Sequence, residues 1–129
     1  MKHVLAAPAS LTAALLTAGP LAAPPAAAAA RAGADLVITV TPVHGGGAYR
    51  YFLSCDPDDG GHPRPGHACY ALRAVNGVVE DLDVDPGACT KQYSPVDVDI
   101  VGRWRGREIG YHREFPNKCV MDRTLGPVV

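Results

Sequence analysis

The sequence lacks an uninterrupted apolar segment long enough to cross a membrane. Residues 1–30 are rich in Ala and Leu, but prolines interrupt them, so no apolar run reaches the roughly 18 residues that a spanning helix needs. A basic start at Lys2, an apolar middle and small residues at Ala28–Ala30 are typical of a secretory signal peptide. We therefore predict that residues 1–30 are removed during export, with the cleaved bond left open. Residues 31–129 are then a single secreted, extracellular domain without a membrane partner.

An excess of positive charge is also missing. Residues 31–129 carry 11 Lys and Arg against 13 Asp and Glu, a net charge of −2. Binding to nucleic-acid phosphates requires a basic excess on one face of a protein, so this balance argues against nucleic acid as a partner. The remaining length of about 99 residues suits one small domain with a modest core.

Familiar catalytic motifs are absent as well. The sequence contains neither a G-x-S-x-G nucleophile elbow nor an H-E-x-x-H metalloprotease motif. A cysteine nucleophile would need a free thiol, and the four cysteines of this chain have a simpler use in disulfides. We therefore predict that the protein is not an enzyme.

A zinc site is not expected either. His62 and His67 lie close in sequence to Cys55 and Cys69, but the spacing within this Pro-rich loop fits no standard zinc pattern. Export also favours oxidation of the thiols over their use as thiolate ligands. We interpret both histidines as solvated loop residues.

Residues 81–89, DLDVDPGAC, begin like a calcium-binding loop, with an aspartate at every second position. However, Pro86 occupies the position where such a loop requires glycine, and Gln92 stands where the glutamate at the twelfth position belongs. We interpret the segment as an exposed acidic loop. The sequence therefore predicts neither a metal nor a cofactor.

What the chain does have is an even number of cysteines, Cys55, Cys69, Cys89 and Cys119, all in residues 31–129. In a small exported domain this count predicts two disulfides. Four cysteines allow three pairings, of which nearest-neighbour pairing is the simplest. It would close loops of about 15 and 31 residues, worth about 3 and 4 kcal/mol in the chain-entropy model. That is a large share of a net stability of about 5–15 kcal/mol.

The hydrophobic pattern predicts an α+β fold. Alternating apolar residues indicate strands over residues 35–41, 49–54, 96–104 and 107–115. A helical stripe begins at Gly66, and Asn76–Gly77 is a typical helix end. Residues 78–95 have no clear period, and residues 116–123 could form a last helical turn. Strands grouped before and after a helix, without β-α-β alternation, are typical of this class.

The irregular segment contains the stretch GACTKQYSP, residues 87–95, in which Lys91 follows Cys89 by two positions. If Cys89 pairs with Cys119, the bridge holds this stretch in one shape, which removes much of the ordering cost of binding. A trypsin-like protease has an acidic pocket suited to one long basic side chain. The pattern therefore indicates a rigid, substrate-like loop that presents Lys91 to a protease.

Five segments, in combination with the four cysteines, resemble the Streptomyces subtilisin inhibitor family of small secreted serine protease inhibitors. They are DLVITV, HPRPGHAC, GACTKQYSPV, GRWRGREIGYHREF and PNKCVM, and the resemblance that they anchor extends over nearly the whole of residues 31–129. The resemblance implies an antiparallel sheet of about five strands with two short helices on one face. It also implies the pairing Cys55–Cys69 and Cys89–Cys119, and a homodimer formed through the sheet. The C-terminal tail, DRTLGPVV, is short beside relatives and leaves the last strand poorly defined.

The resemblance further implies where a protease would attack. In this family the reactive bond follows the second residue after the third cysteine, which corresponds to Lys91–Gln92, with Lys91 as P1 and Gln92 as P1′. Asn117 matches a family asparagine that braces the loop by hydrogen bonds. The other residues expected to contact a protease, from P4 to P2 and at P2′, are Ala88, Cys89, Thr90 and Tyr93.

The function predicted from this resemblance is substrate-like inhibition of serine endopeptidases, of the subtilisin type and, through Lys91, of the trypsin type. Two alternatives stay open. The chain could be a disulfide-stapled secreted module for a non-protease partner, with Lys91 an incidental surface charge. It could also be a transglutaminase substrate, with Gln92 as acyl donor and Lys91 or Lys118 as acceptor.

Overall fold

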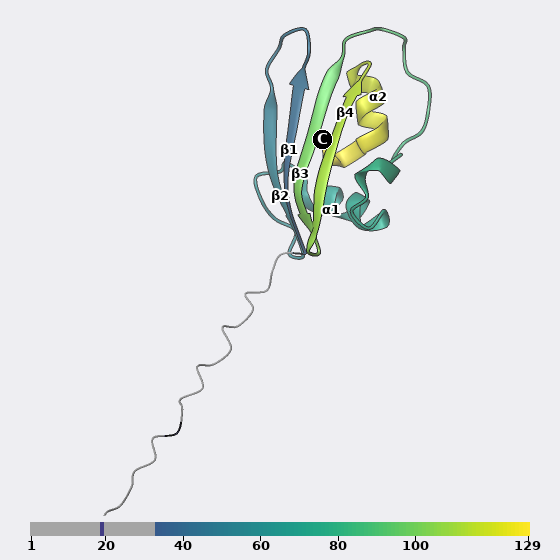
Figure 1. The fold of residues 1–129 in the computed structure, drawn as a ribbon. Helices are drawn as coiled ribbons and strands as arrows, with labels where there is room; N and C mark the ends of the chain where they lie inside the picture. Colours follow the sequence, from purple (N-terminus) through teal and green to yellow (C-terminus); the bar gives the residue numbers. More distant parts are fainter. Residues whose placement is uncertain (1–18, 20–32) are drawn as a thin grey trace, which may run out of the picture.

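The computed structural model describes Gly19 and residues 33–129, so the predicted signal peptide lies, apart from Gly19, outside the described residues. Four strands and two helices make up the described chain, with two short 3₁₀ helices, η1 and η2. Their bounds are β1 Ala34–Pro42, β2 Tyr49–Cys55, α1 Pro65–Ala74, η1 Val79–Asp81, β3 Val96–Trp104, β4 Arg107–Phe115, α2 Lys118–Leu125 and η2 Gly126–Val128. The strands form one antiparallel sheet in the order β2-β1-β3-β4, and both helices cover the same face of it (Figure 1). The α+β prediction is therefore confirmed.

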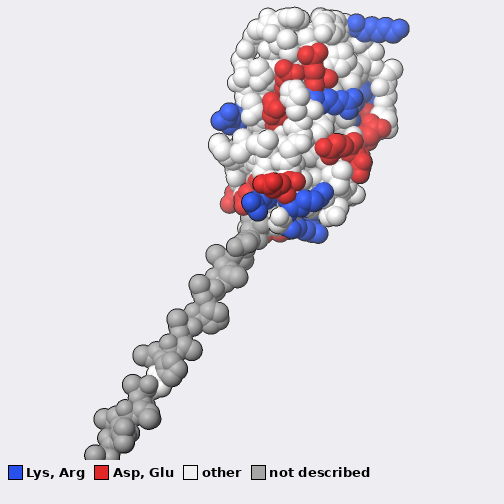
Figure 2. Space-filling model, in the orientation of Figure 1, with Lys and Arg blue, Asp and Glu red and all other residues white. Residues whose placement is uncertain are grey.

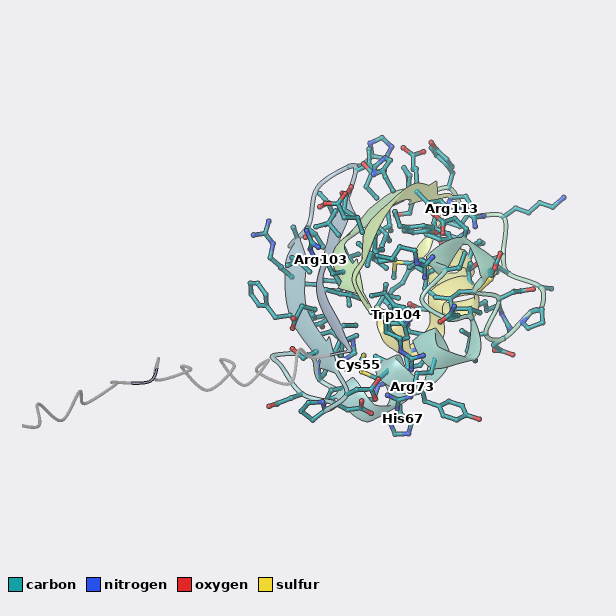
Figure 3. All side chains as sticks on the ribbon, turned by 60° about the horizontal axis from the view of Figure 1, so that its bottom comes forward. Cys55, His67, Arg73, Arg103, Trp104 and Arg113 are labelled. Atoms are coloured by element: carbon teal, nitrogen blue, oxygen red, sulfur yellow. A yellow bond between two sulfur atoms is a disulfide. The ribbon has the colours of Figure 1, made fainter. Side chains whose placement is uncertain are left out.

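Alternation along the strands explains this layering, because every second side chain of a strand points to the same face. The face under the helices is apolar, whereas the other face carries mainly polar side chains and is exposed. Trp104 is 1% exposed and lies between the sheet and the helices (Figure 3). The strand residues of the core include Leu36, Ile38, Val40, Leu53, Val98, Ile100, Trp104, Tyr111 and Phe115.

The end of α1 depends on close packing against Trp104. Asn76 and Gly77 both adopt positive φ, 50° and 72°, and the Gly77 N–H donates to the Leu72 carbonyl at 2.8 Å. A Cβ on Gly77 would lie 2.3 Å from the Trp104 ring. Glycine is thus required here both for its backbone conformation and for the space it leaves.

The expected count of about five strands is wrong for the described residues, which contain four. Residues 82–95 form no strand, and the C-terminal tail continues as helix α2 to Leu125. Gly126, at φ 55°, then turns the chain into η2, where Val128 is fully buried. The tail is therefore used to fill the core under α1 and cannot extend the sheet.

The interpretation of His62 as a solvated residue is also wrong, whereas His67 is exposed as expected. His62 is 5% exposed, its Nε2 lies 3.1 Å from the Val128 carbonyl, and its Nδ1 accepts from the Arg64 N–H at 3.0 Å. Because Nδ1 is an acceptor, Nε2 carries the proton and donates. Burial lowers the pKa of His62, so the ring is neutral. It links the loop between β2 and α1 to η2.

The first disulfide joins Cys55 at the end of β2 to Cys69 in α1, across 14 positions. Beside it, Arg73 donates from Nη1 and Nη2 to the carboxylate of Asp58, at 2.8 and 2.9 Å, and from Nη1 also to the carboxylate of Asp56, at 3.1 Å. Figure 3 shows Cys55 and Arg73 close together at this end of the molecule. A covalent bond and a bidentate ion pair therefore attach α1 to the loop that follows β2.

Candidate functional site

Residues 82–95 leave η1, pass over α2 and enter β3 at the end of the sheet where the β1–β2 turn also lies (Figure 1). Between Asp83 and Ser94 only Cys89 is partly buried, and all other residues are exposed. Without strand or helix pairing of its own, this segment takes its conformation from its attachments to α2. We call residues 88–93 the contact loop.

The second disulfide and one asparagine hold the contact loop over the start of α2. Cys89 is bonded to Cys119, 30 positions later, which is the pairing that the resemblance implies. The Asn117 side-chain N–H₂ donates to the carbonyl of Thr90 at 3.1 Å and to that of Gln92 at 2.8 Å. These carbonyls flank Lys91, so a single amide side chain holds the backbone on both sides of the exposed lysine.

Asn117 is itself held by the helix it precedes. It is the N-cap of α2, where its Oδ1 accepts from the Val120 N–H at 3.0 Å, and it is 8% exposed. Asparagine is among the best N-cap residues because its oxygen satisfies a free helix N–H. The Asn117 amide oxygen is thus bonded to α2 and the amide nitrogen to the contact loop, so this one side chain fixes the loop relative to the helix.

Tyr93, 67% exposed, lies on the other side of Gln92 next to the β1–β2 turn. Its ring meets the His44 ring edge-on at 6.3 Å between centroids, and its hydroxyl lies 3.4 Å from a carboxylate oxygen of Glu114. The chain leaving the loop is fixed by a backbone hydrogen bond from the Val43 N–H to the Pro95 carbonyl at 2.9 Å. Sequence reasoning missed these neighbours, because the β1–β2 connection and β4 meet the loop only in the tertiary structure.

A hollow of about 370 Å³ lies between the contact loop, the sheet and the start of α2. Tyr49 and Met121 contribute to its floor, and burial raises the pKa of Tyr49. The loop thus touches the body of the protein at discrete attachments, with open space between them. The lining residues are Val40, Pro42, Tyr49, Thr90, Gln92, Ser94, Val96, Asn117, Lys118, Cys119 and Met121.

The described residues offer no separate metal centre. The one cluster of potential ligands among them is Cys55, Asp58 and Cys69. Both sulfurs are bonded to each other, and the Asp58 carboxylate is engaged by Arg73, so these groups are not available as ligands. None of the described helices is both long and apolar enough to cross a membrane. On the face seen in Figure 2, acidic and basic side chains are interspersed without a large area of one sign.

Proteins of known family are similar to this chain in sequence. The family model "Subtilisin inhibitor-like" matches residues 32–117. A trypsin inhibitor of Streptomyces longisporus is 39% identical over 118 residues, covering 90% of this chain and 74% of its own length. A subtilase-type protease inhibitor of Streptomyces fradiae is 38% identical over 106 residues, 75% of this chain and 73% of its own.

A solved structure is similar as well. It is sermetstatin of Streptomyces caespitosus, crystallised in complex with subtilisin of Bacillus licheniformis, with 31% identity and a TM-score of 0.57. The match covers 74% of this chain and 96% of the sermetstatin chain. The family that these relatives represent consists of protease inhibitors and not of enzymes. The chain belongs to the subtilisin inhibitor-like family.

Proposed function

We propose that the protein is a secreted, substrate-like inhibitor of serine proteases of the subtilisin type and, through Lys91, of the trypsin type. The observation that carries this proposal is the contact loop itself. Lys91 is exposed between two carbonyls that Asn117 holds, and the segment is linked to α2 by the Cys89–Cys119 disulfide. A loop already ordered in this way loses little freedom when it enters an active-site cleft.

In this proposal the protease attacks the Lys91–Gln92 bond as it would attack a substrate. The protease serine forms an ester with the Lys91 carbonyl carbon, and the nitrogen of Gln92 takes up a proton and leaves as an amine. Asn117 retains the Thr90 and Gln92 carbonyls on the two sides of the cut. The amine therefore stays beside the ester and can attack it, which re-forms the peptide bond and frees the serine before water completes hydrolysis.

The choice of target classes rests on Lys91 and on the relatives. An acidic specificity pocket, as in trypsin, attracts a lysine side chain. Related chains are named as inhibitors of trypsin and of subtilases, and sermetstatin was crystallised with subtilisin. The proposed contacts on either side of the bond are Ala88, Cys89, Thr90 and Tyr93.

We also propose that the protein works as a homodimer through the exposed face of the sheet. Phe52, Val37 and Val101 are register partners across β2, β1 and β3, with Phe52 58% and Val101 49% exposed. This apolar row, with Gly110 opposite Val101 on β4, is suited to self-association about a two-fold axis.

The proposal is tested by titrating residues 31–129 against subtilisin and trypsin while following hydrolysis of a small chromogenic substrate. We expect both activities to fall in proportion to added protein, and mass spectrometry to find one slow cut, after Lys91. Full activity of both enzymes at excess protein, with both disulfides intact, would refute inhibition. A cut elsewhere would refute the assignment of the bond.

A further inference from the structure

Residues 82–95 have a second attachment to α2, at the C-terminal end of this helix. The Arg123 Nη1 donates to the carbonyl of Asp85 at 3.2 Å and to its carboxylate at 3.0 Å. The backbone adds two hydrogen bonds here, from the Asp85 N–H to the Arg123 carbonyl at 2.8 Å and from the Val84 N–H to the Thr124 carbonyl at 3.1 Å. The side chain of Arg123 is 35% exposed, so it packs partly against the segment that it binds.

Gly87 lies directly against this guanidinium. A Cβ built on Gly87 would be 2.5 Å from Nη1 and 3.0 Å from Cζ of Arg123. Any larger residue at position 87 would therefore have to displace the arginine. Arg123 can therefore reach Asp85 only because position 87 has no side chain. This contact lies just before Ala88, where the contact loop begins.

Together these contacts make the segment run antiparallel to α2. Asp85 binds Arg123 in the last turn, Cys89 is bonded to Cys119 in the first turn, and Gln92 is held by the N-cap Asn117. Figure 1 shows the segment passing along the outer side of this helix. The two backbone hydrogen bonds hold Val84 and Asp85, and the Arg123 side chain adds the contacts to the Asp85 carbonyl and carboxylate and the packing against Gly87.

We propose that Arg123 is a positioning residue for the contact loop. It holds residues 85–87 against α2, so that the residues that follow, Ala88 to Lys91, adopt the conformation that a protease binds. This inference rests on the proposed function, since the loop must be the protease-binding element. Holding the segment at Asp85 as well as at Cys89 shortens its free span, and a shorter free span has less conformational freedom to lose on binding. A loosened segment should bind more weakly and be hydrolysed faster.

The test compares Arg123→Gln, Asp85→Asn and the double variant with the parent chain. Because a partly exposed ion pair contributes modestly, we expect each single change to raise Ki about threefold to tenfold. Cleavage after Lys91 should accelerate by a similar factor. The double variant should be no worse than Arg123→Gln alone, because Arg123→Gln already removes the ion pair that Asp85→Asn removes, together with the bond to the Asp85 carbonyl. Arg123→Lys should raise Ki less than Arg123→Gln does, since lysine keeps the charge but lacks the planar, multi-donor guanidinium.

Gly87 supplies a sharper version of the same test. Gly87→Ala should raise Ki in the presence of Arg123, because the new methyl group displaces the guanidinium. In the Arg123→Ala background the space is free, so the same change should have little further effect. Equal effects of Gly87→Ala in both backgrounds would contradict the packing argument.

Arg103→Gln is the matched control, because Arg103 is 67% exposed and its nearest carboxylate contact, to Glu108, is 3.9 Å. It should leave Ki and cleavage unchanged. Thermal unfolding of all variants separates positioning from stability: the inference requires weaker inhibition with an unchanged Tm, and a loss that tracks Tm overturns it. Unchanged Ki and cleavage in Arg123→Gln overturn it too, while inhibition by the parent chain leaves the proposed function standing.

Amide hydrogen exchange provides a readout that does not need a protease. The N–H groups of Val84 and Asp85 donate to carbonyls of α2, so Arg123→Gln should increase exchange at these two amides, whereas Arg103→Gln should not. If the parent chain inhibits neither enzyme, the proposed function fails, and exchange still decides the positioning role. Unchanged exchange at Val84 and Asp85 would then overturn it.

Discussion

Lys91 is exposed in the contact loop and is not part of the hydrophobic core. We therefore expect Lys91→Asp to raise Ki for trypsin on the order of a hundredfold or more, because an anchor residue is lost and a like charge faces the acidic pocket. Folding should be nearly unaffected, with a change in Tm of no more than a few degrees, since surface substitutions seldom alter stability by more than about 0.5 kcal/mol. Inhibition assays and thermal unfolding measure the two effects separately.

Lys118→Asp is the matched control for this substitution. Lys118 follows Asn117 in the chain, its side chain is 70% exposed, and its Nζ lies 2.5 Å from a carboxylate oxygen of Asp122. Trypsin inhibition should persist in this variant. Tight trypsin inhibition by Lys91→Asp, or loss of inhibition in Lys118→Asp alone, would show that Lys91 is not the lysine that trypsin recognises.

Among the elements, α1 is attached to the preceding loop by an ion pair that depends on pH. The hydrogen bonds from Arg73 lower the pKa of Asp58 from 3.8 to about 2. A carboxyl group whose pKa is lower in the folded state stabilises the fold above its unfolded pKa and loses this contribution as the pH falls through the folded one. The contribution of Asp58 should thus be complete above about pH 4 and vanish near pH 2.

We expect Asp58→Asn to lower Tm at pH 6, with the difference from the parent chain shrinking between pH 4 and pH 2. Thermal unfolding at pH 6, 4 and 2 measures this directly. Asp83→Asn, at an exposed position in the loop after η1, is the control and should show no comparable trend. A difference that stays constant down to pH 2 would mean that Asp58 acts by something other than its charge.

At the scale of the whole molecule, the proposed dimer depends on the outer face of the sheet. Polar side chains flank the apolar row, including the pair of His112 and Asp99, with 2.9 Å between Nδ1 and Oδ1. We expect Val101→Asp to shift the protein from dimer to monomer, because an unpaired charge would be buried between the two copies. Analytical ultracentrifugation over a range of concentrations measures this change.

Tyr70→Asp, on α1 and 75% exposed, lies on the helix side of the molecule and should leave the association state unchanged. The contact loop is formed within one chain, so monomeric Val101→Asp should still inhibit. A parent chain that sediments as a monomer at all concentrations would exclude the dimer, without affecting the proposed inhibition.

Much of the fold could be predicted because its elements carry strong local signals. The alternation in residues 96–104 and 107–115 predicted β3 and β4 with those bounds, and Asn76–Gly77 marked the end of α1. The start of α2 was less clear. The helix begins at Lys118 because Asn117 caps it, and an asparagine before a helical stretch is a signal available in the sequence.

The amino-acid sequence by itself determined the strands, the α+β class and the candidate loop around Lys91. Such features depend on periodicity and on neighbours along the chain, which a sequence displays directly. Only the tertiary structure decided that His62 is buried against η2, that the tail fills the core as a helix, and that Arg123 binds Asp85. Each of these depends on residues far apart in the chain, 38 positions for Arg123 and Asp85, whose contact follows from how the whole chain packs.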